Sequence, residues 1–160
     1  MYSGVAFTLG ENMSNPQRFI FLSSKFFHEY PTEKFPQIKQ KTNRPYIQII
    51  FEVDGIKFAA PLCSGIRHPY AFWTNKKEHK GIDLSKAVVI KDDSYIDTTS
   101  VPRIRPEEFD VLRGKDYQIK TKMKQYLKKY QKAKENPDKP FSQNIIQFSA
   151  LQYFERELGF

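Results

Sequence analysis

At 160 residues with a formal net charge of +8, the chain has room for one hydrophobic core, and its charge favours polyanions as partners. No apolar run approaches the ~18 residues of a membrane-spanning helix, and the N-terminus lacks the basic start and long apolar stretch of a signal peptide. We therefore expect a cytoplasmic protein that makes no membrane contact, with nucleic acid as its leading partner.

The chain is expected to begin with a loose lead-in. Residues 1–17 contain no Lys or Arg and show no sustained periodicity. A single domain then covers residues 18–160, since no repeat or low-complexity tract marks a linker. The apolar run 18–22 suits a strand, and the Ser-Ser pair after it can cap a short helix that ends at Pro31.

The clearest local structure is a β-hairpin over residues 46–62. Alternating residues flank Asp54-Gly55, the pair preferred in two-residue type I′ turns. Glu52 then lies opposite Lys57, an opposite-charge pair worth about 0.2–1 kcal/mol that supports the same register. The pairing places four apolar pairs on one face: Val53 with Ile56, Phe51 with Phe58, Ile49 with Ala60, and Ile47 with Leu62.

Shorter strands come next, and helices follow them. Residues 71–73, 87–90 and 95–98 are predicted strands, and the second of these is expected to be buried on both faces because it is an unbroken apolar run. A helix opens at Pro106 and stops at Gly114. Strands early and helices late indicate an α+β fold with an antiparallel sheet.

A basic amphipathic helix is predicted over residues 115–134. Its apolar positions fall at helical spacing, and they are Ile119, Met123, Tyr126, Leu127 and Tyr130. Lysines crowd its remaining surface: Lys115, Lys120, Lys122, Lys124, Lys128, Lys129, Lys132 and Lys134. Ser142 is expected to cap a last helix in which Phe141 packs on Ile146, and the predicted core face of that helix contains Ile145, Phe148, Leu151, Phe154 and Leu158.

The open end of the hairpin gathers polar side chains. Continued pairing beyond Leu62 sets Tyr46 opposite Cys63, and the neighbouring residues bring cations, hydroxyls and one imidazole to the same place. The predicted catalytic cluster consists of Arg44, Tyr46, Ser64, Arg67 and His68.

This mixture suits cleavage of an RNA phosphodiester without a metal ion. The RNA 2′-hydroxyl attacks the adjacent phosphate, so the reaction needs a base, an acid and donors for the growing negative charge. Arg44 and Arg67 can supply the donors, His68 can transfer protons, and Ser64 or Tyr46 can orient the phosphate. Taken singly, each of these residues is more often an ordinary surface or packing residue, and only their convergence favours a site.

Metal and cysteine chemistry are not expected. Asp92-Asp93 lies in a turn-like sequence near Asp83 and Asp97, and adjacent residues of a strand point to opposite faces, so a ligand set is disfavoured. The lone Cys63 can form neither an internal disulfide nor a zinc site. We expect no cofactor.

Three stretches in order resemble the endoribonuclease toxins of type III toxin–antitoxin systems, of ToxN/AbiQ type and more closely of CptN/TenpN type. Residues 21–27 (FLSSKFF) are similar to the family's opening strand and helix, residues 44–47 (RPYI) with 54–64 (DGIKFAAPLCS) to its central hairpin, and residues 81–90 (GIDLSKAVVI) to the segment that follows. The likeness covers roughly residues 18–134.

The resemblance implies a compact, strongly curved, barrel-like antiparallel sheet surrounded by helices. It also implies metal-independent RNA cleavage that leaves a 2′,3′-cyclic phosphate, inhibition by a small folded antitoxin RNA, and a closed protein–RNA oligomer. Arg44 stands where ToxN-type toxins have Lys, and Ser64 matches the family's serine. Cys63 replaces a hydroxyl residue and Ile66 replaces a second Lys, which puts ToxN-like residue roles in doubt.

RNA binding is predicted for eight lysines: Lys57, Lys86, Lys115, Lys120, Lys122, Lys124, Lys128 and Lys129. The expected partners are an antitoxin RNA and cellular RNA substrates. Two alternatives stay open. A non-catalytic module that holds RNA through the basic helix explains the charge as well as the nuclease does, and a third possibility is a basic structural or phage-associated protein that binds no RNA.

Overall fold

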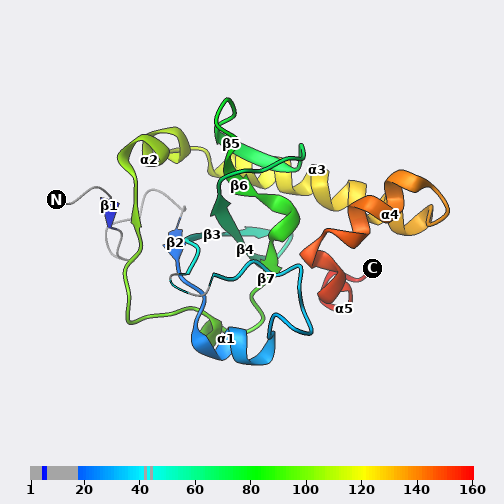
Figure 1. Cartoon of the computed structure of the whole chain (residues 1–160), viewed down its shortest axis with the longest axis horizontal. Coiled ribbons are helices and arrows are strands. Elements are labelled where there is room, and N and C mark those ends of the chain that lie inside the picture. Colours follow the sequence, from blue (N-terminus) through cyan, green and yellow to red (C-terminus); the bar gives the residue numbers. More distant parts are fainter. Residues whose placement is uncertain (1–4, 7–17, 42, 44) are drawn as a thin grey trace.

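The structure is a computed structural model that describes residues 5–6, 18–41, 43 and 45–160. It combines helices with a six-stranded antiparallel sheet (Figure 1). The strands are β1 (Val5–Ala6), β2 (Arg18–Ile20), β3 (Gln48–Val53), β4 (Ile56–Cys63), β5 (Ala71–Asn75), β6 (Lys80–Asp83), β7 (Val88–Val89) and β8 (Arg103–Ile104). The α-helices of the described chain are α1 (Ser24–Glu29), α2 (Pro106–Leu112), α3 (Asp116–Glu135), α4 (Pro140–Gln147) and α5 (Glu155–Leu158).

The predicted hairpin is confirmed in position and register. Strands β3 and β4 pair from Val53–Ile56 to Gln48–Pro61, and Glu52 lies opposite Lys57. Asp54 and Gly55 both have positive φ, at 51° and 80°, as a type I′ turn requires. The turn sequence and the alternating pattern therefore specified the same pairing.

Strand β4 is the hub of the sheet. The main sheet runs in the order β2-β3-β4-β6-β5, and β7 pairs with β4 beside β6. The path ends at β2 and β5, so the sheet is not closed. The expectation of a barrel-like sheet is therefore wrong, whereas an antiparallel sheet combined with helices is confirmed. Closure into a barrel requires the two edge strands to pair with each other, and here β2 pairs with β3 and β5 with β6, but β2 and β5 do not pair.

The basic helix forms as predicted and closes one side of the core. Helix α3 buries Ile119, Met123, Tyr126, Tyr130 and Ala133, and it contacts strand β3. The buried hydroxyl of Tyr126 donates to Ser149 Oγ at 2.6 Å. The apolar stripe of the helix therefore does what its 3.6-residue period indicates.

The C-terminal region departs from the single helix expected there. Helix α4 begins at Pro140 with Lys139 as its N-cap, and η4 (Ala150–Tyr153) separates it from α5. Ser142 is buried within α4 instead of capping it. Phe141 and Phe148 are 52% and 54% exposed, so their predicted packing roles are wrong. The break after Gln147 turns the chain and takes Phe148 off the buried face.

Two further predictions are corrected near the edge of the sheet. Strand β1 pairs with β8 through Val5–Ile104 and Ala6–Arg103, so these two residues of the predicted lead-in are held against the domain, while residues 1–4 and 7–17 lie outside the described part. The predicted strand 95–98 is replaced by η3 (Asp93–Tyr95) and a single bridge between Ile96 and Leu22. Strands β5 and β7 were correctly anticipated. No helix in the described residues has the length and apolar character needed to cross a membrane.

Candidate functional site

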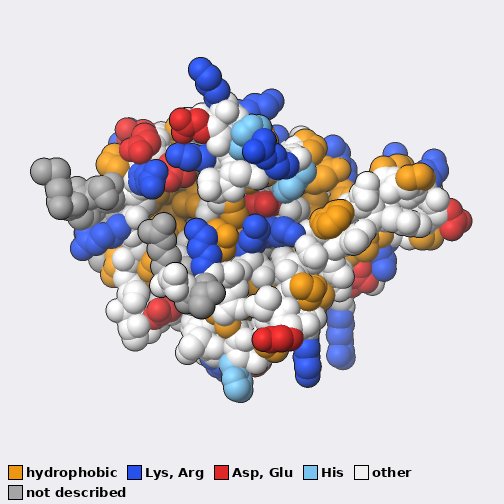
Figure 2. All heavy atoms as spheres, viewed as in Figure 1, with side chains coloured by type: hydrophobic (Ala, Val, Ile, Leu, Met, Phe, Trp, Pro, Cys, Tyr) orange, Lys and Arg blue, Asp and Glu red, His pale blue; other side chains and the backbone are white. Residues whose placement is uncertain are grey.

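A pocket of about 550 Å³ lies at the open end of the hairpin, and we refer to it as the basic pocket. Its polar lining consists of Lys41, Tyr46, Cys63, Ser64, Lys80, Arg103, Arg105 and Glu108. Its apolar lining consists of Phe21, Pro45, Ile47, Leu62, Val101 and Ile104. Figure 2 shows a hollow with hydrophobic side chains at its floor and Lys and Arg side chains around it.

The pocket lies where the pairing of β3 with β4 ends. The N–H of Leu62 donates to Ile47 O at 2.8 Å, and β3 itself begins only at Gln48, while the opposite edge of β4 pairs with β6, with Cys63 opposite Gly81. The chain before β3 leaves the sheet at this point, and Gly65 reverses the chain after β4 in a left-handed conformation, φ 70°. The two chain segments diverge, and the space between them is the pocket.

Two of the predicted catalytic residues line this pocket. Tyr46 and Ser64 face it from opposite strands of the hairpin end, as the extended register indicated. Lys41 Nζ lies 4.4 Å from the centroid of the Tyr46 ring, a cation–π contact that also places a cation beside the phenol. The pocket therefore joins hydroxyl donors to positive charge, the chemistry that a phosphodiester requires.

His68 belongs to a neighbouring hydrogen-bond network. Its Nε2 lies 3.2 Å from Asp83 Oδ2 and 3.2 Å from Ser85 Oγ, while its Nδ1 accepts from the Tyr70 backbone N–H at 3.0 Å. A backbone N–H can only donate, so Nδ1 carries the lone pair and Nε2 carries the proton that points at Asp83. Both ring nitrogens are thus engaged, and the network fastens the loop after β4 to the end of β6.

Asp83 is the buried centre of that network. Its carboxylate accepts from Ser85 N at 3.0 Å and from Ser85 Oγ at 2.6 Å, in addition to His68. Burial by itself raises the pKa of Asp83, but the hydrogen bonds from His68 and Ser85 outweigh it and hold that pKa below the ordinary value. The carboxylate is therefore ionised at neutral pH.

Cys63 is chemically quiet. Burial, with a smaller contribution from the negative charge of Asp83, raises the pKa of its thiol to about 12. A thiol in this state is neither a nucleophile nor a good donor. The Cys63 thiol therefore cannot take over the chemistry of the hydroxyl that the resembling toxin family has at this position.

The remaining members of the predicted cluster do not converge completely. Arg67 is exposed and does not line the basic pocket, and Arg44 lies outside the described residues, although its neighbour Pro45 lines the pocket. The structure thus places Tyr46 and Ser64 in the lining of one pocket, to which Arg67 does not contribute.

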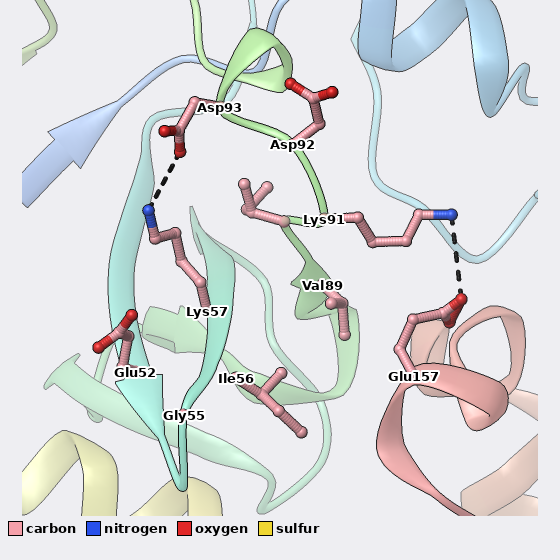
Figure 3. A pocket seen from close by; sticks show the side chains of 10 residues that line it. Glu52, Gly55, Ile56, Lys57, Val89, Lys91, Asp92, Asp93 and Glu157 are labelled. Atoms are coloured by element: carbon pink, nitrogen blue, oxygen red, sulfur yellow. Dashed lines mark hydrogen bonds and ion pairs between the residues drawn. The ribbon is translucent and has the colours of Figure 1, made fainter.

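Two lysines predicted to bind RNA are tied to protein groups. Lys86 Nζ donates to Gln37 Oε1 at 2.7 Å and to Phe148 O at 2.8 Å, and burial lowers its pKa. Lys57 pairs with Asp93 at 3.2 Å in a second pocket of about 410 Å³ (Figure 3). The other lysine of that pocket, Lys91, points toward Glu157 at 3.9 Å. This second pocket mixes both signs of charge and does not attract an anion in the way that the basic pocket does.

The lysines of α3 are distributed around the helix. Lys120 pairs with Asp116 at 3.1 Å and Lys124 with Asp54 at 3.7 Å. Lys129 lies over the Tyr70 ring at 5.6 Å, so it is the helix lysine placed beside the His68 network. Lys128 is exposed, whereas Lys115 and Lys122 are half-buried. The helix thus presents several separate cations to solvent, and one flank of it adjoins the network.

Sequence reasoning missed four cations of the basic pocket: Lys41, Lys80, Arg103 and Arg105. The alternation of Arg103, Ile104 and Arg105 is the two-residue period of a short strand, with Ile104 buried, and this signal was available. Glu108 was also missed, because the residues around it in the sequence do not indicate that its side chain lines a pocket. Among the described residues, no three His, Cys, Asp or Glu side chains are grouped as a metal ion requires; Asp92 instead caps η3.

No protein-family model, curated protein or solved structure matches this chain.

Proposed function

We propose that this protein is a metal-independent endoribonuclease toxin of the type III toxin–antitoxin kind, and that the basic pocket is its RNA-cleaving site. The observation that carries the proposal is the placement of the Tyr46 and Ser64 hydroxyls at the hairpin end, among four cations. The residues that resemble the toxin family and the residues that line the pocket are partly the same, because the hairpin end supplies both.

In the proposed reaction the RNA 2′-hydroxyl attacks the adjacent phosphorus, the bond to the 5′-oxygen breaks, and a 2′,3′-cyclic phosphate remains. Arg103 and Arg105 offer forked donors for the non-bridging oxygens, and Ser64 helps to fix the phosphate. Proton transfer passes to the pocket lining, to Tyr46 or a lysine, because both nitrogens of His68 are already hydrogen-bonded. His68 then acts as a positioning residue for the loop that carries Ser64.

The same basic surface suits the antitoxin. A folded RNA that occupies the pocket would block substrate entry, and its phosphates would also reach the exposed cations outside the pocket, such as Arg67 and Lys128. We propose a closed protein–RNA assembly as the inhibited form, in a cytoplasmic setting. A discrete RNA of a few tens of nucleotides that copurifies with the protein would support this part of the proposal, and heterogeneous fragments would count against it.

A non-catalytic RNA-binding module is the second candidate, because exposed lysines on α3 can hold a backbone without cutting it. Single-turnover incubation of RNA in EDTA separates the two functions. The nuclease shortens the RNA and leaves cyclic phosphate ends, whereas the binding module returns it at full length.

Variants locate the activity. Ser64→Ala and Arg105→Ala are each expected to slow cleavage by about 10²–10³, the usual effect of removing one transition-state donor, with folding retained. Arg113→Ala is the matched control, because Arg113 is the C-cap of α2, does not line the basic pocket, and has a 65% exposed side chain that contacts Asp110 and the Phe109 ring. If Ser64→Ala and Arg105→Ala cleaved RNA as fast as Arg113→Ala, the cleavage site would lie elsewhere. A requirement for magnesium would refute the proposed mechanism.

A further inference from the structure

Glu108 is the one carboxylate in the described lining of the basic pocket. It occupies the first turn of α2, where the helix dipole favours negative charge. Among the described residues its hydrogen bond comes from Thr74, whose Oγ1 donates to Glu108 Oε2 at 3.4 Å. In the described part of the chain no Lys or Arg lies within ion-pair distance of it, although cations share the pocket. Carboxylate oxygens therefore face the pocket with acceptor capacity to spare.

The walls around Glu108 suit a flat, partly apolar ligand. Pro45, Val101 and Ile104 contribute to the apolar part of the lining, and Val101 is 49% exposed although it is a large hydrophobic residue. Bases of single-stranded RNA are splayed into such pockets and read on their Watson–Crick edges. The cations of the same pocket can hold the phosphate attached to the base.

The four bases present different edges to a carboxylate. Guanine offers two adjacent donors, N1–H and N2–H, which match two carboxylate oxygens. Adenine and cytosine each place an acceptor nitrogen next to their amino group, and this lone pair would repel a carboxylate oxygen. Uracil has a single N–H between two carbonyls. Guanine is therefore the only base whose Watson–Crick edge satisfies both oxygens.

The geometry points to the basic pocket as a binding site for an unpaired guanine base, with Glu108 accepting hydrogen bonds from guanine N1–H and N2–H. This inference rests on the proposed function in one respect only: both place RNA in the same pocket. It goes further, because it assigns a base preference and the residue that sets it. Arg105 lines the same pocket and can hold the phosphate beside the guanosine, whereas Lys80 Nζ already pairs with Glu78 at 3.3 Å.

The test is titration of the purified full chain with 3′-GMP, 3′-AMP, 3′-CMP and 3′-UMP, followed by ¹H–¹⁵N NMR, which detects weak binding. We expect 3′-GMP to bind roughly tenfold more tightly than the others, within the range of one bidentate base contact. Glu108→Gln offers one donor and one acceptor and should abolish the preference. Glu107→Gln is the matched control, because Glu107 is exposed in the same helical turn and does not line the pocket.

Three results would overturn the inference: equal binding of the four nucleotides, binding of none, or a guanine preference that survives Glu108→Gln in a folded variant. RNA cleavage by the same preparation is scored separately. Cleavage without guanine preference would sustain the nuclease and refute the base assignment. Guanine binding by a chain that cuts no RNA would refute the nuclease and leave the base assignment standing.

Discussion

Replacing Asp83 by Asn tests the network that holds the hairpin end together. The side chain of Asp83 is 5% exposed; its Oδ1 accepts from Ser85 N and Oγ, and His68 Nε2 lies 3.2 Å from both Oδ1 and Oδ2. Asn has the same shape but only one acceptor oxygen. If that oxygen keeps the two Ser85 bonds, the amide NH₂ meets the Nε2–H of His68, donor against donor.

The expected loss of folding stability follows from this one contact between the introduced amide and His68. A hydrogen bond to a charged group contributes about 1.5–3 kcal/mol, and removing the buried charge recovers part of its desolvation cost, so Asp83→Asn should destabilise the fold by ~2 kcal/mol at pH 7. For a chain of this length that corresponds to a fall in Tm of roughly 4–8 °C. Asp110→Asn is the control, because Asp110 is 67% exposed and should change stability by less than about 0.5 kcal/mol.

The pH dependence has a definite sign. The pKa of Asp83 is lower in the folded protein than in the unfolded chain, so its contribution is fully present above about pH 4 and is lost as pH falls through the lowered pKa. Urea unfolding followed by circular dichroism at pH 7 and pH 3 should therefore show the gap between wild type and Asp83→Asn narrowing in acid. A variant as stable as wild type at pH 7, or a gap that does not change with pH, would refute the reasoning.

Four further outcomes are expected. Gly81→Ala should cost at least ~1–3 kcal/mol in thermal melting, since its Cβ would overlap Phe72 O and approach Trp73 Cα to 2.9 Å; a cost near zero would mean that β5 can move away. Tyr126→Phe should cost about 1–2 kcal/mol in urea unfolding by removing the buried hydrogen bond to Ser149 Oγ, which keeps only the N–H of Leu151 as a donor, while the control Tyr117→Phe, 77% exposed, should cost nothing measurable. Lys129→Ala should flatten the salt dependence of RNA binding by about 0.7 in slope, and Lys124→Ala, paired with Asp54, should leave it unchanged; the reverse order would move the RNA to the other flank of α3. Cys63 should resist alkylation in the native protein at pH 8 and react once unfolded, since its pKa is about 12; rapid native labelling would contradict its burial.

The parts of the fold that were predictable are those decided by local chemistry. The register of the hairpin followed from Asp54-Gly55 and the alternation around it, and α3 followed from its apolar period. Tyr46 and Ser64 could be placed at one end of the hairpin for the same reason. In each case neighbours in sequence supply the interaction that decides the structure.

The parts that were missed depend on contacts between distant segments. Strand β8 has two residues and exists because β1, nearly a hundred positions earlier, pairs with it. Without that pairing nothing indicates that Arg105 approaches Tyr46. The His68 network likewise depends on β6 placing Asp83 beside the loop after β4, and a lone His in a sequence does not reveal that both of its nitrogens are engaged.

The order of the pocket's lining along the chain sets when the pocket can exist. That lining comes from five separate stretches of chain, and the last of them ends at Glu108. During synthesis, which proceeds from the N-terminus, the hairpin can form early, but the ring of cations stays incomplete until β8 and the start of α2 have left the ribosome. A truncated chain that ends before Arg103 would therefore carry the hairpin motif without the pocket. On the proposed function, incomplete products of translation would therefore lack the RNA-cleaving site.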